Sequence, residues 1–174
     1  MSLKSCVKGF FLVAFVVAIA RAEKPPVADA RQLLAYIDRK GAQTTLHELS
    51  SQEVERVLTR IDSGAPLWLE VAKKLAPVSD GAAAEGLGIS LAIALTLNPE
   101  GVLPLLGAPN ELPLGIDRVC SLPFIESTER HDREHVRRVR AALRHVTSPD
   151  LTAKKAECLK IINDLAATRL VPPM

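Results

Sequence analysis

Two histidines, His131 and His135, have the residue type and spacing that come closest to a metal site in this sequence. They stand four residues apart, so a helix would place both imidazoles on one face, where they can share a metal ion. A closed site needs one or two further ligands, and neither of the other two histidines has a spacing that supplies one. We therefore expect a solvated, charge-rich helix face here. A metal-dependent hydrolase that uses His131 and His135 is the alternative.

A small-residue run that contains Ser90 has a faint likeness to the nucleophile elbow of hydrolases. That elbow requires a strand before the serine, whereas the sequence predicts Ser90 in the middle of a helix. We expect its hydroxyl to bond back to a helix carbonyl. Gly86 and Gly88 lack the third glycine and the preceding strand of a dinucleotide-binding loop, so we expect them to let neighbouring helices approach closely. No catalytic residue and no cofactor are predicted.

Arginines are concentrated over residues 130–144, where a long helix is predicted. Acidic residues at positions 126, 129, 132 and 134 nearly balance the N-terminal half of this segment. The distinctly basic part therefore begins at Arg137, and its arginines are the candidates for contact with an anionic partner: Arg137, Arg138, Arg140 and Arg144. The alternative is an ordinary charged outer face of a helix.

Residues 1–22 have the three parts of a secretory signal peptide. Two lysines precede an apolar stretch over residues 9–20, and Ala20-Arg21-Ala22 supplies the small-x-small pattern at which signal peptidase cleaves. That apolar stretch would form about 18 Å of helix, which is too short for a bilayer core of about 30 Å. We expect cleavage after Ala22 and export to the periplasm or the medium. The mature chain, residues 23–174, is then one domain with no membrane span.

Loss of the leader changes what the composition implies. The chain of 174 residues has 22 basic and 20 acidic residues, and the leader holds three of the basic residues and none of the acidic ones. Since 19 basic residues remain against 20 acidic ones, the basic excess belongs to the export signal and does not indicate nucleic-acid binding. The mature chain keeps one aromatic residue of each type, too few for a surface that stacks bases or sugars: Tyr36, Trp68 and Phe124.

Two cysteines, Cys120 and Cys158, remain after the leader is removed. An isolated pair in an oxidising compartment predicts one disulfide, which would fasten the terminal helix to the segment that follows the central helices. Two unpaired buried thiols are the alternative.

Apolar residues spaced three and four positions apart predict helices throughout the mature chain. Ser50 and Glu53 form a capping box before one of these helices, and residues 82–97 are apolar nearly all round, as in a central buried helix. Residues 107–115 hold two prolines and two glycines and predict a loop. No alternating strand pattern appears, so we expect an all-α fold. It is either an irregular multi-helix bundle or a HEAT-like stack of helix pairs, although no sequence repeat supports the stack.

Three segments resemble those of short exported proteins from GC-rich proteobacteria: GAPLWLEVAKKLAP (64–77), LNPEGVLPLL (97–106) and DRVCSLPFIE (117–126). The resemblance covers most of the mature chain. It implies export and an all-helical fold, and it brings no activity, cofactor or catalytic residue with it.

These features together favour a non-enzymatic function. We expect an exported helical module that binds another protein or a peptide, of which an immunity protein that blocks a secreted toxin is one example. A periplasmic enzyme built on the two histidines remains the competing hypothesis.

Overall fold

The computed structural model describes residues 24–122, 124 and 127–170, and within these ranges the chain forms helices joined by short connections. No strand occurs in these ranges, where a single isolated bridge pairs Gly107 with Gly115. The all-α prediction is confirmed. The predicted leader, residues 1–22, lies outside the described part of the chain. Among the described helices, none combines the length and the apolar character that crossing a membrane requires.

The described chain contains α-helices and short 3-10 helices, which follow one another in this order: α1 (Ala30–Lys40), α2 (Ala42–Glu48), α3 (Ser51–Ile61), α4 (Pro66–Leu75), η1 (Ala76–Val78), α5 (Gly81–Leu95), α6 (Pro99–Val102), η2 (Leu103–Leu105), α7 (Ile116–Val119), α8 (Glu129–Arg144), η3 (Pro149–Leu151) and α9 (Thr152–Arg169).

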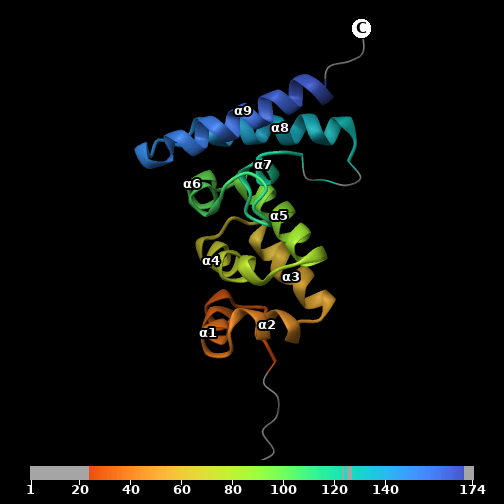
Figure 1. Cartoon of the computed structure of the whole chain (residues 1–174), viewed down its shortest axis with the longest axis vertical. Coiled ribbons are helices and arrows are strands. Elements are labelled where there is room, and N and C mark those ends of the chain that lie inside the picture. The colour runs from red at the N-terminus through yellow and green to blue at the C-terminus, as the bar shows by residue number, and fades with distance from the viewer. Residues whose placement is uncertain (1–23, 123, 125–126, 171–174) are drawn as a thin grey trace, which may run out of the picture.

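The helices are stacked along the long axis of the molecule, as Figure 1 shows. Helices α1 and α2 form one end and pack on α4, which packs in turn on α3. Helix α5 joins α3 to α6 and α7, and α9 packs on α7 and α8 at the other end. Layers therefore succeed one another roughly in chain order. The members differ too much in length for a regular repeat, since α6 and α7 have only four residues each.

Side-chain caps fix the beginnings of several helices. Ser50 and Glu53 form the predicted capping box of α3, in which the side-chain oxygen of each residue accepts a hydrogen bond from the backbone N–H of the other. Thr128 accepts from the backbone N–H of His131 at the start of α8. In the sequence, Ser148 followed by Pro149 predicts the N-cap and first turn of the terminal α-helix. In the structure these residues lead into the 3-10 helix η3, and α9 begins only at Thr152.

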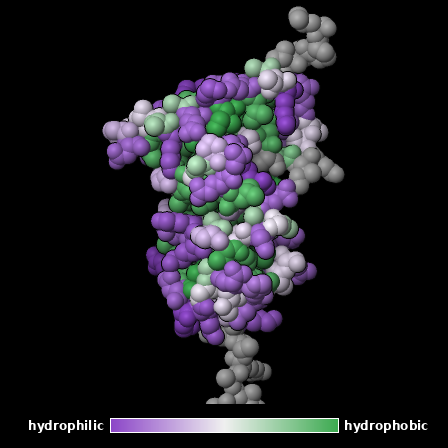
Figure 2. All heavy atoms as spheres, in the orientation of Figure 1, coloured by the Kyte–Doolittle hydropathy of each residue, from purple (hydrophilic) through white to green (hydrophobic). Residues whose placement is uncertain are grey.

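Helix α5 is the centre of the core, as its uniformly apolar sequence predicts. More than half of its residues are buried: Ala84, Leu87, Gly88, Ser90, Leu91, Ala92, Ala94 and Leu95. Its glycines permit close contacts, because a Cβ on Gly86 would lie 2.6 Å from a methyl carbon of Leu58, and one on Gly88 would lie 2.7 Å from Nε of Arg118. Helices α3 and α7 can therefore approach α5. Figure 2 shows hydrophobic side chains emerging between layers whose outer surface is mainly hydrophilic.

The disulfide between Cys120 and Cys158 joins the short helix α7 to the middle of α9. Both residues are fully buried, and their Cα atoms are 5.2 Å apart. The predicted loop over residues 107–115 connects η2 to α7, and Lys154 of α9 donates to the carbonyl of Leu106 just before this loop. The C-terminal hairpin of α8 and α9 is thus attached to the centre of the stack by a covalent bond and by hydrogen bonds.

Candidate functional site

An arginine row runs along helix α8. It consists of Arg133, Arg137, Arg140 and Arg144, which are spaced by four, three and four residues and therefore share one side of the helix. The buried side of the same helix is formed by an apolar seam of Val136, Val139 and Leu143. Since the seam packs toward the stack, the arginine row is turned outward beside α9.

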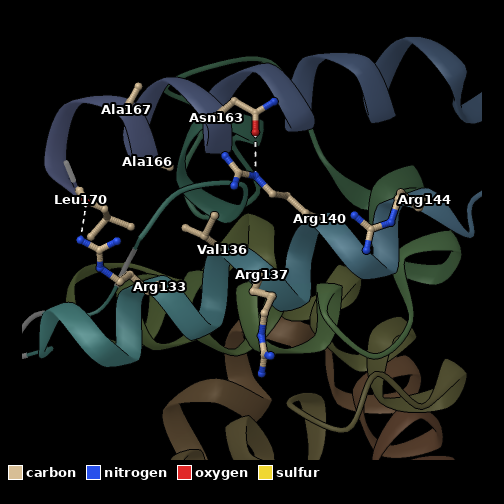
Figure 3. Close-up of a pocket in the computed structure, with 9 residues that line it drawn as sticks. All are labelled: Arg133, Val136, Arg137, Arg140, Arg144, Asn163, Ala166, Ala167 and Leu170. Carbon is tan, nitrogen blue, oxygen red and sulfur yellow. Dashed lines mark hydrogen bonds between the residues drawn. The ribbon is translucent and has the colours of Figure 1, made fainter.

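The arginine row forms one wall of a groove between α8 and α9, with a volume of about 620 Å³. Figure 3 shows this arginine groove, in which Val136 lies between the two helices. Helix α9 and its end supply the opposite wall, and these residues are small, apolar or uncharged: Asn163, Ala166, Ala167 and Leu170. No acidic residue lines the groove in the described part of the chain.

Two of the arginines reach across the groove to α9. Arg140 donates from Nε to Oδ1 of Asn163 at 2.8 Å, and Arg133 donates to the carbonyl oxygen of Leu170 at 2.5 Å. Arg133 also pairs with Glu129 on its own helix. The Arg144 side chain, which also lines the groove, has no hydrogen bond or ion pair with any other described residue.

Glu134 partly compensates the charge of α8 outside the groove. Its carboxylate pairs with Arg137 at 2.5 Å and with Arg138 at 2.8 Å, and these two guanidinium groups lower its pKa to about 2. In Figure 3 the Arg137 side chain is directed away from α9, and 76% of it is exposed. Arg137 therefore forms the exposed outer edge of the groove, where it is paired with Glu134.

The structure places three of the four predicted contact arginines in this groove: Arg137, Arg140 and Arg144. Arg138 lines a different cavity, with Glu134 and the two histidines. Arg133 takes the fourth position instead, although it lies in the half of α8 whose charge the acidic residues nearly balance. The spacing of four residues between Arg133 and Arg137 is the signal that would have found it.

The two histidines lie against Phe124 rather than on an open face. The Phe124 ring centroid is 4.7 Å from that of His131 and 4.9 Å from that of His135. His131 is exposed, as predicted, whereas His135 is only 5% exposed. Burial and the neighbouring His131 lower the pKa of His135 to about 4, so its imidazole is neutral near pH 7.

The described residues offer these histidines no completed metal site. Within the described ranges no group of three His, Cys, Asp or Glu side chains is close enough to hold an ion. The cavity beside them, about 530 Å³, has Ile89, Ile93 and Thr96 of α5 on its other side. The chemistry available there is that of one exposed and one buried neutral imidazole.

Ser90 has no nucleophile geometry. It lies inside α5, is 4% exposed, and donates from Oγ to the carbonyl oxygen of Leu58 at 3.2 Å. The acceptor belongs to α3, so the hydroxyl joins two packed helices and does not bond back to its own helix as the sequence suggested.

Comparison with known proteins adds no assignment to this geometry: neither a protein-family model nor a curated protein nor a solved structure matches the chain.

Proposed function

We propose that the mature chain is an exported, non-enzymatic binding module whose arginine groove binds an acidic segment of a partner protein. The observation that carries this proposal is the arginine row itself, because four guanidinium groups line one groove and no acidic side chain lines it in the described residues. Arginine presents a rigid fork of donors that matches carboxylate geometry. The opposite wall gives apolar contact, which a charged surface alone lacks.

An immunity protein that neutralises a secreted toxin is one function in this class. The charge of the groove restricts it to toxins that present an acidic segment. A toxin whose basic surface binds nucleic acid would be repelled by the arginine row.

Site-specific photo-crosslinking in the producing cell tests the binding proposal. A photoreactive phenylalanine in place of Ala167, which lines the groove and is exposed, should form a covalent adduct with a single partner. The same amino acid in place of Ala35, exposed on α1 at the other end of the stack, is the matched control and should form none.

The adduct should depend on the arginines. Arg140→Glu with Arg144→Glu should reduce it at least tenfold, since two charge-assisted hydrogen bonds are each worth about 1.5–3 kcal/mol and about 1.4 kcal/mol is tenfold in affinity. Arg31→Glu with Lys73→Glu changes the net charge equally on exposed sites of α1 and α4 and should leave it unchanged. An adduct that survives reversal of the groove arginines contradicts the proposal.

Export rests on the leader and on the disulfide, which is typical of proteins outside the cytoplasm. We expect the mature protein to begin at Glu23, because small residues at positions 20 and 22 fit the signal-peptidase site. Sequencing of the N-terminus of protein from the cell envelope measures this. Ala20→Gln should block processing, while Glu23→Gln should not. A chain that retains Met1 and sediments with membranes would refute cleavage.

A further inference from the structure

The shape of the arginine groove adds to the proposed function, on which this inference rests. Arg133 and Arg144 are eleven residues apart on α8, so the arginine row extends for about 16 Å, or three helical turns. Helices α8 and α9 pack side by side over this length. A groove between two adjacent helices is the surface on which a third helix packs, because its side-chain ridges fit between theirs.

The two walls of the groove differ in a way that orients such a helix. The α8 wall carries long cationic side chains, whereas Ala166 and Ala167 on the α9 wall end at a single methyl group. A helix lying in the groove can therefore approach α9 closely with an apolar stripe. The adjoining stripe of the same helix then faces the guanidinium groups, and carboxylates there would be paired.

We propose that the occupant of the arginine groove is an amphipathic α-helix of the partner protein, with Asp or Glu residues recurring every three to four positions beside an apolar stripe. The pattern four, three, four of the arginine row has the period of a helix, so acidic residues with the same period on a parallel or antiparallel helix meet successive arginines. The uncommitted guanidinium of Arg144 marks one end of this contact, and the exposed Arg137 lies in its middle.

Other polyanions fit the groove less well. No aromatic residue lines it in the described chain, so bases of a nucleic acid have no ring on which to stack. A phosphate chain lacks apolar groups to pack on Ala166 and Ala167, which line the groove opposite the arginines. An extended acidic peptide rises about 3.3 Å per residue and alternates its side chains, so its carboxylates do not repeat with the helical pitch.

Three synthetic peptides of about 18 residues and identical composition test the proposal against the whole mature protein, by fluorescence anisotropy at 0.15 M salt. The first places four glutamates in the pattern four, three, four beside an alanine and leucine stripe. The second distributes the same residues evenly around the helix. All three contain one proline: it stands at the end of the first two peptides, whereas the third keeps the first pattern but has the proline exchanged with a central residue, which breaks the helix.

We expect the patterned peptide to bind at least tenfold more tightly than the other two, and to gain helical circular dichroism in the complex. Arg140→Glu with Arg144→Glu should abolish that preference, whereas Arg31→Glu with Lys73→Glu should retain it. Equal, arginine-dependent binding of all three peptides would overturn the helical occupant and leave the acidic-segment proposal standing. A patterned peptide that fails to bind, binds independently of the groove arginines, or is displaced by equimolar duplex DNA would also overturn the helical occupant. The adduct from Ala167 then decides separately whether the groove binds a partner protein.

Discussion

Replacement of both bridged cysteines, Cys120→Ala with Cys158→Ala, should lower the free energy of unfolding by roughly 4 kcal/mol. The disulfide closes a loop between residues 38 positions apart, and opening it returns conformational entropy to the unfolded chain. For a protein of this length the loss corresponds to a fall in melting temperature of roughly 10 °C. Thermal unfolding followed by circular dichroism measures it.

Reduction of the native protein separates the effect of the crosslink from that of the lost sulfur atoms. Both cysteines are fully buried, so dithiothreitol should act only after the C-terminal hairpin opens or on warming. The reduced native protein should then melt close to the double variant, and the double variant should not respond to dithiothreitol. A melting temperature that is unchanged by reduction in the native protein would show that the bridge adds nothing to stability.

Most of the fold follows from local sequence patterns. The box of Ser50 and Glu53 needs only residues within one turn, and the apolar run around Leu91 needs no knowledge of its neighbours to indicate burial. The disulfide could be predicted because only two cysteines follow the predicted leader. The start of α9 was harder to predict, because Pro149 suits the first turn of a 3-10 helix as well as that of an α-helix.

The composition of the arginine groove could be predicted only in part, because it depends on how α9 lies against α8. The seam of Val136, Val139 and Leu143 fixes which side of α8 is buried, and this much is present in the sequence. Which outer arginines face α9 depends on the position of Asn163 and Leu170, which lie 23 and 37 residues from their arginine partners. The sequence therefore predicts Arg138 as a contact residue and does not predict Arg133.

The burial of His135 could also be predicted only in part. It lies next to Val136 and four residues before Val139, so its place at the edge of the buried seam was available from the sequence. The contact with the ring of Phe124 could not be predicted, because this residue lies outside the helix and packs against both histidines. Its contact depends on the path of the chain before α8, for which no periodic pattern exists.

Acidification should destabilise the protein through His135. Its pKa is about 4 in the folded chain, against 6.5 for a free imidazole, because burial disfavours the charged form. Between these two values the unfolded chain binds a proton that the folded chain does not, so the free energy of unfolding falls as the pH falls. We expect a loss of about 2 to 3 kcal/mol between pH 7 and pH 4.5, measured by urea unfolding at each pH.

A variant that cannot titrate assigns this loss to one residue. His135→Gln should flatten the pH dependence over this range, whereas His47→Gln, which removes an exposed histidine from α2, should keep it. The pH range of the loss also distinguishes His135 from the paired carboxylate of Glu134. That carboxyl group has a pKa of about 2 in the folded chain against 4.5 for a free glutamate, so its stabilising contribution is nearly intact at pH 4.5 and is lost between about pH 4.5 and pH 2. If His135→Gln lost as much stability as the native protein between pH 7 and pH 4.5, the imidazole would not be held neutral by the fold. Water would then reach the His135 imidazole despite its contact with Phe124.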